Sequence, residues 1–179
     1  PFPKKSKIFY TPSNFEKGIH VKYEPSDNIR FGIVGSIDPN KNIFFALKLY
    51  SKLVQIFPSG SFIVLGKVSD AGYLKLLEEE IIRLDINVTF ACYESPEEIY
   101  HCLDVLICCS HDESFGLVCH EAAMNGKPII SRELEAYNEV LAGYPLNISV
   151  DDTIANLADV VSFLKESRSF YYKNPYFRE

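Results

Sequence analysis

The chain has 179 residues, enough for one domain with a substantial core but short for two independent ones. Hydrophobic residues make up 47% and charged residues 23%, which excludes a disordered chain, and no apolar run approaches the ~20 residues of a bilayer-crossing helix. The formal net charge is −6 and the sequence has no basic stripe, so it lacks the positive surface that nucleic-acid-binding proteins use.

The predicted elements alternate along the chain. Residues 1–28 contain several prolines and are expected to form an extended entry segment. From Ile29 on, apolar runs of strand length alternate with segments of helical period, which predicts a parallel α/β sheet with helices on both faces. Strands are expected at residues 29–34, 61–65, 87–90, 104–109, 127–130 and 147–150, and helices at 43–57, at 73–84, from Pro96, from about Phe115 and from 151 to about 165.

This pattern predicts one domain, residues 29–168, followed by an aromatic tail, residues 169–179. The tail has five aromatic side chains and is expected to dock on a protein surface. The five cysteines lack the paired spacing of a zinc site and are interpreted as buried free thiols: Cys92, Cys102, Cys108, Cys109 and Cys119.

Two loops are candidates for a ligand site, because open α/β sheets bind ligands beyond the carboxyl ends of their strands. Residues 110–116 lead into a helix whose first amides lack intrahelical partners and suit a phosphate, and Gly116 lets a ligand approach the backbone. The earlier loop, GSIDPNKN, places Gly35 at the turn and Lys41 before the next helix, where a lysine can neutralise phosphate charge. It lacks the G-x-G-x-x-G fingerprint, so a dinucleotide cofactor is not favoured.

Glu121 is unexpected in the helix that follows, because this helix has no lysine or arginine and its pattern predicts burial. A buried carboxylate needs hydrogen-bond donors. Helical side chains lean toward the N-terminus, so Glu121 is expected to point back toward the phosphate site, where ribose hydroxyls would supply donors. Glu113 and His111, on the loop, are expected at the far end of such a ligand.

The stretch ESFGLVCHEAAMNGKPII, residues 113–130, carries the most specific motif: two glutamates separated by seven residues, a helix of small residues, and Gly-x-Pro before an apolar pair. It resembles the pattern of glycosyltransferase family 4, also called glycosyl transferases group 1, whose members have the GT-B fold. GSIDPNKN, IVLGKV, VTFACYES and AYNEV agree more loosely, in the same order. From about Phe31 to Gly143 the chain is similar to the Rossmann-like, nucleotide-sugar-binding C-terminal half of that fold.

The resemblance implies the donor site of a retaining, hexose-transferring enzyme that needs no metal ion or cofactor. Glu121 would bind the ribose hydroxyls, Glu113 would be the catalytic residue at the transferred sugar, and Lys41 would neutralise the diphosphate. The other implied donor-binding positions are Gly35, Ser36, Tyr93, His111, Ser114, Phe115, Gly116, Leu117 and Val118. The acceptor would be a glycan or a lipid-linked sugar, as in polysaccharide biosynthesis, and the enzyme would be cytoplasmic or peripheral at the inner membrane face.

Two features depart from the family. Ser36 stands where many members carry arginine, so one contact to the leaving group is lost or supplied elsewhere. The N-terminal half that binds acceptor is missing from these residues, so the chain alone is expected to bind donor but transfer little. Two alternatives stay open: a non-catalytic transferase-like binding or scaffold module, which Ser36 supports, and a GT-B-type nucleotide-sugar epimerase, which the two glutamates fit less well.

Overall fold

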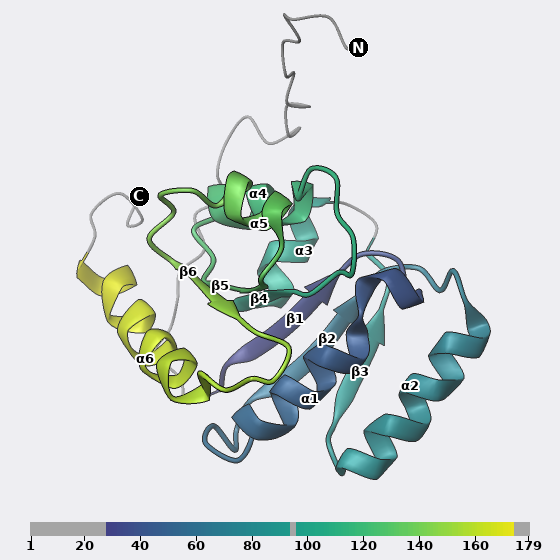
Figure 1. Cartoon of the computed structure of the whole chain (residues 1–179). Coiled ribbons are helices and arrows are strands. Elements are labelled where there is room, and N and C mark those ends of the chain that lie inside the picture. The colour runs from purple at the N-terminus through teal and green to yellow at the C-terminus, as the bar shows by residue number, and fades with distance from the viewer. Residues whose placement is uncertain (1–27, 94–95, 174–179) are drawn as a thin grey trace, which may run out of the picture.

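A single parallel sheet organises the computed structural model of the chain, which describes residues 28–93 and 96–173 (Figure 1). The six strands follow the order β3-β2-β1-β4-β5-β6. Their bounds are Arg30–Val34 (β1), Ser61–Leu65 (β2), Val88–Ala91 (β3), Val105–Cys108 (β4), Ile129–Arg132 (β5) and Asn147–Val150 (β6). The order reverses between β1 and β4, so the loops after these two strands diverge and leave room between them.

Helices cover both faces of the sheet, which confirms the predicted fold class. On one face lie α1 (Ile43–Leu53), α2 (Ala71–Leu84) and α6 (Leu157–Lys173), and on the other α3 (Pro96–Cys102), α4 (Leu117–Met124) and α5 (Glu135–Val140). Because successive strand residues point to opposite faces, Ile33 packs toward α1 while Val34 packs toward the α3–α4 side. Both faces of the central strands are therefore core.

Several helix boundaries differ from the sequence prediction. Helix α1 ends at Leu53 instead of residue 57, and α2 begins at Ala71 instead of residue 73. The last helix begins at Leu157 instead of residue 151 and continues to Lys173. The Asp151 carboxylate accepts hydrogen bonds from the amides of Thr153 and Ala155, and Ile154 adopts a φ of 56°, so this segment is a turn that delays the helix. Helix α5, which contains the AYNEV segment, was not predicted as a helix.

The two terminal segments are mostly beyond what the structure describes. The predicted entry segment lies outside the described residues apart from Asn28, and so does the part of the aromatic tail from residue 174 on. Residues 169–173 of the predicted tail belong to α6. Within the described residues, none of the helices is both long and apolar enough to span a membrane.

Candidate functional site

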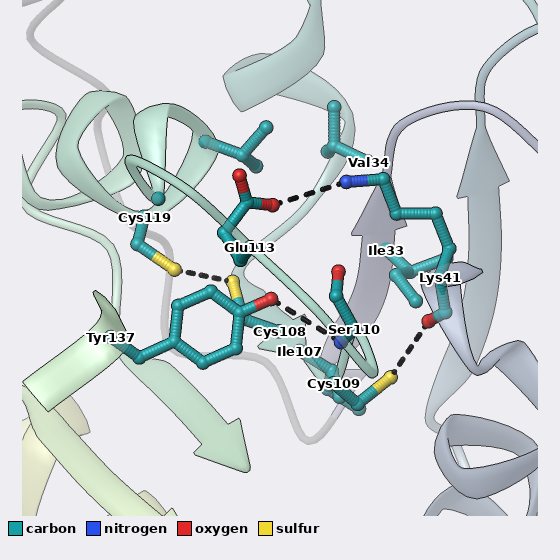
Figure 2. A pocket seen from close by; sticks show the side chains of 12 residues that line it. Ile33, Val34, Lys41, Ile107, Cys108, Cys109, Ser110, Glu113, Cys119 and Tyr137 are labelled. Carbon is teal, nitrogen blue, oxygen red and sulfur yellow. Dashed lines mark hydrogen bonds and ion pairs between the residues drawn. The ribbon is translucent and has the colours of Figure 1, made fainter. Parts of the chain in front are cut away.

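A hollow lies beyond the carboxyl ends of β1 and β4, between the two loops selected from the sequence (Figure 2). Its volume is about 280 Å³, open solvent included. Four of the predicted site residues line it: Lys41, Glu113, Gly116 and Val118. The rest of its wall and floor is formed by Ile33, Val34, Ile107, Cys108, Cys109, Ser110, Cys119 and Tyr137. The sheet topology thus brings together two loops that are far apart in the sequence.

Lys41 and Glu113 form an ion pair across the hollow, with 3.3 Å between Nζ and Oε2. Each side chain is about one-fifth exposed, at 21% and 22%. Lys41 ends a short 3-10 helix, η1 (Pro39–Lys41), whose N-terminus is capped by the Asp38 carboxylate. The Lys41 stem passes over Gly35, where a methyl group would lie only 2.9 Å from Lys41 Cε. Among the described residues that line the hollow, Lys41 is the only cation, and it is thereby held beside a carboxylate.

Asn40, a residue with no predicted role, joins the two loops. Its backbone carbonyl accepts a hydrogen bond from the His111 amide at 2.7 Å. Its side-chain amide donates to the Asp112 carbonyl at 3.0 Å and accepts from the Asp112 amide at 3.1 Å. These three bonds fix Asp112, the residue next to Glu113. His111 takes part through its backbone amide, and the residue is exposed.

The N-terminus of α4 faces the same hollow. Gly116 is the N-cap residue, with a φ of 60° in the left-handed region and no side chain to bond the first-turn amides. The helix therefore begins at Leu117, two residues after the predicted start at Phe115. First-turn amides and the positive end of the helix dipole make this a suitable place for an anion.

The prediction that α4 is buried on nearly all sides is wrong. Cys119 and Ala122 are buried, but Leu117 is 38% and Met124 40% exposed, and Phe115 in the preceding loop is 51% exposed. The sequence pattern shows which side chains are apolar but not which are buried, and some apolar side chains of α4 are exposed. Ser114 is exposed as well.

Glu121 is half-buried, and the protein itself supplies one of the donors that its carboxylate needs. The hydroxyl of Tyr100, on α3, donates to Glu121 Oε2 at 3.0 Å and lies 3.3 Å from the Val118 carbonyl. Glu121 follows Val118 by nearly one turn, so the carboxylate lies beside the N-terminal turn of α4. Tyr100 was not recognised from the sequence, where it is one more apolar residue of a short helix.

The floor of the hollow is apolar and uncharged. The thiols of Cys108 and Cys119 lie 2.8 Å apart, and burial raises the pKa of Cys108 well above its usual value and that of Cys109 to about 12. The Tyr137 hydroxyl accepts from the Ser110 amide at 3.3 Å. All five cysteines are free thiols as predicted, but Cys92 and Cys102 are exposed, which corrects the expectation that all are buried.

Eight of the predicted positions lie outside the lining of the hollow: Gly35, Ser36, Tyr93, His111, Ser114, Phe115, Leu117 and Glu121. Ser36 donates its hydroxyl hydrogen bond to Asp38 within the first loop. Tyr93, just after β3, is 37% exposed. Gly35 lies beneath Lys41, and its carbonyl oxygen is packed so closely against Gly66 that a Cβ on Gly66 would lie 1.8 Å from it. Among the described residues, no three or more His, Cys, Asp or Glu side chains gather as a metal site would require.

Known proteins resemble this chain in sequence and in fold. The chain is 28% identical over 131 residues to the poly(glycerol-phosphate) alpha-glucosyltransferase of Bacillus subtilis, an alignment that covers 72% of the chain and 19% of that protein. The structure matches that of TarM (TM-score 0.69, 16% identity, 88% of this chain and 32% of that one). It also matches Anabaena Alr3699/HepE in complex with UDP-glucose (TM-score 0.67, 20% identity, 81% and 45%).

The chain therefore spans about a fifth of the length of its Bacillus relative and less than half of each of the two solved structures. Because the sequence identity to these structures is low, the match shows a shared fold only. That fold is the Rossmann-like half of a GT-B glycosyltransferase. The family model described as glycosyl transferases group 1 matches residues 5–173, nearly the whole chain. The chain belongs to the glycosyl transferases group 1 family.

Proposed function

We propose that the chain is the donor-binding half of a retaining glycosyltransferase, which holds a nucleoside diphosphate sugar in the hollow and transfers a hexose to a glycan or lipid-linked acceptor. The observation that carries this proposal is the meeting of Lys41, Glu113 and the Gly116-capped start of α4 around one hollow, with Glu121 one turn further on. A solved relative of the same fold contains UDP-glucose, which supports this class of donor. The acceptor would be bound by a further domain.

The diphosphate would be held without a metal ion. Lys41 supplies a positive charge, and the amides of Leu117 and Val118 supply donors at the positive end of the helix dipole. As the bond between the sugar and the diphosphate breaks, negative charge grows on the leaving oxygen, and these fixed groups stabilise it. Glu113 pairs with Lys41, so a diphosphate would replace one anionic partner of the ammonium by another.

The sugar and the nucleoside would lie on opposite sides of that diphosphate. Glu113, with the loop backbone of Ser114, Phe115 and Gly116, would bind the transferred sugar, and His111 is near enough in the chain to contribute. Glu121 would accept hydrogen bonds from the ribose hydroxyls. Gly35 and Ser36 would border the diphosphate, and Tyr93, after β3, would border the base.

Calorimetric titration with UDP, GDP and ADP in the absence of divalent metal tests the proposal. We expect one diphosphate to bind, and Lys41→Ala and Glu121→Ala each to weaken it about tenfold or more, the usual effect of losing a charged hydrogen bond. Lys48→Ala and Glu79→Ala remove the same charges from exposed helical positions and serve as matched controls. Binding that neither site variant weakens would refute the assigned site, and no binding at millimolar concentration would refute donor binding by this chain.

A second candidate is a transferase-like module that binds the nucleotide but lacks turnover. The observation that favours it is Ser36, whose hydroxyl is engaged with Asp38 and which brings no positive charge to the first loop. A longer chain containing the acceptor domain, incubated with UDP-glucose, GDP-mannose and ADP-glucose, distinguishes the two. Release of free diphosphate or sugar transfer above the rate of a Glu113→Ala variant would exclude the non-catalytic module.

A further inference from the structure

We propose that Tyr100 is a positioning residue for the nucleoside, because its hydroxyl holds the Glu121 carboxylate in the orientation that receives the ribose hydroxyls of the donor. This inference rests on the proposed function, in which Glu121 is the ribose ligand. Tyr100 itself contacts neither sugar nor phosphate in this proposal. It acts through Glu121.

The hydrogen bond between Tyr100 and Glu121 joins a buried tyrosine hydroxyl to the end of a glutamate side chain. Tyr100 is fully buried on α3, packed in the same core cluster as Cys119 and Ala122 of α4. Its hydroxyl reaches Glu121 Oε2 at 3.0 Å. A glutamate side chain has several rotatable bonds, and ordering it on binding has an entropic cost, whereas a carboxylate already held by a buried tyrosine has lost that freedom beforehand.

One donor leaves the carboxylate able to bind a ligand. The Tyr100 hydroxyl has a single proton, and a carboxylate can accept about four hydrogen bonds, so this contact occupies one acceptor position of Oε2 and leaves capacity for two ribose hydroxyls. Burial, and then the charge of Glu121, raise the pKa of Tyr100, which keeps the hydroxyl protonated and donating at any physiological pH. The Val118 carbonyl, 3.3 Å from the hydroxyl in the first turn of α4, competes for the same proton, and the shorter contact is the one to Glu121 Oε2.

The test compares ribose with deoxyribose. Wild type, Tyr100→Phe and Tyr144→Phe are titrated with UDP, GDP and ADP and with the 2′-deoxy form of each. Tyr144 is the matched control, because its half-buried hydroxyl also donates to a backbone carbonyl, that of Lys127 at 3.0 Å, away from the hollow. We expect wild type to bind the ribo form about tenfold more tightly than the deoxy form, the size of one hydrogen bond to a charged group. Tyr100→Phe should reduce that preference to about threefold or less, and Tyr144→Phe should leave it unchanged.

A role in holding the fold together gives a different result. If Tyr100 only supports the packing of α3 on α4, Tyr100→Phe lowers the affinity for both forms equally and the preference survives, which would overturn the inference. A second comparison protects against a general folding defect: adding Tyr100→Phe to Glu121→Ala should not weaken binding further, because the group that Tyr100 positions is already gone. Additive losses would also overturn the inference.

The outcomes separate this inference from the function on which it rests. If Glu121→Ala abolishes the ribose preference and Tyr100→Phe does not, the proposed donor site stands and the role of Tyr100 fails. If wild type binds none of the diphosphates, or binds ribo and deoxy forms equally, the ribose assignment of Glu121 fails and the inference falls with it.

Discussion

Lys127, just before β5, allows a quantitative test of the electrostatics of the protein interior. The side chain is 3% exposed, and its ammonium donates to the Leu103 carbonyl at 3.0 Å. Burial lowers its pKa from 10.5 to about 8, although Asp104 nearby acts in the opposite direction. A lowered pKa of this size means that holding the charged form inside the fold costs about 3 kcal/mol relative to the unfolded chain. Replacing Lys127 by methionine removes that cost together with one hydrogen bond.

The sign of the effect depends on pH. Below pH 8 the lysine is charged in both states, so the cost is fully present. Between pH 8 and 10.5 the folded chain releases its proton first, and the free energy of unfolding contributed by this group rises with pH. At pH 7 we expect Lys127→Met to be more stable than wild type by about 2 kcal/mol, because removing the buried charge gains about 3 kcal/mol and losing the hydrogen bond costs about 1 kcal/mol. Near pH 10.5, where the charge no longer matters, we expect the variant to be less stable by about 1 kcal/mol.

Urea unfolding followed by far-ultraviolet circular dichroism at several pH values between 7 and 10.5 measures this difference. Other groups also titrate in that range, among them the cysteine thiols of the unfolded chain, whose burial in the fold raises the pKa of Cys108 and Cys109, but these groups are shared by both proteins and cancel in the difference. Lys48→Met, at an exposed helical position, should stay within about 0.5 kcal/mol of wild type throughout. A difference between Lys127→Met and wild type that does not change with pH would refute the reasoning.

Three further predictions follow from the same contacts. Asn40→Ala removes two loop-joining hydrogen bonds, so it should lower the free energy of unfolding by about 1–2 kcal/mol in urea and weaken diphosphate binding in calorimetry; full affinity would show that the loops need no tie. Gly116→Ala puts a side chain on left-handed backbone and should destabilise by about 1–2 kcal/mol, measured in the same urea titration, and equal stability would argue against that backbone conformation. In the native protein a maleimide should label Cys92 and Cys102 rapidly and the three other cysteines only after unfolding, as followed by mass spectrometry; rapid labelling of all five would contradict the described burial.

The fold was predictable because most of its helices and strands carry their own periodicity. SFIVL and NISV form strands at the predicted bounds, since short apolar runs between turn residues are typical of the strands of a parallel sheet. Helix starts were less predictable. Asp151 and Gly116 each change the local backbone, one through side-chain bonds to following amides and the other through left-handed φ, and neither effect alters the apolar pattern. The six-residue helix α5 is too short to display a period.

The site was predictable as far as its loops. Lys41 and Glu113 were placed on the loops after the first and the fourth predicted strand, and the sheet brings them to 3.3 Å by setting β4 beside β1. Asn40 and Tyr100 were missed because their importance lies in partners 72 and 21 residues away, which only the folded chain brings into contact. In the sequence, an asparagine in a turn and a tyrosine in an apolar helix have ordinary explanations.

Gly66 shows how a residue outside the hollow can control it. The space that a Cβ would need on Gly66 is already taken by the Gly35 carbonyl oxygen, so any other residue would push the end of β1 and, with it, the turn over which Lys41 lies. In a survey of all substitutions scored by nucleotide binding, position 66 should therefore be as intolerant as the charged residues of the site. A map of ligand contacts inferred from such a survey would include a residue that touches no ligand.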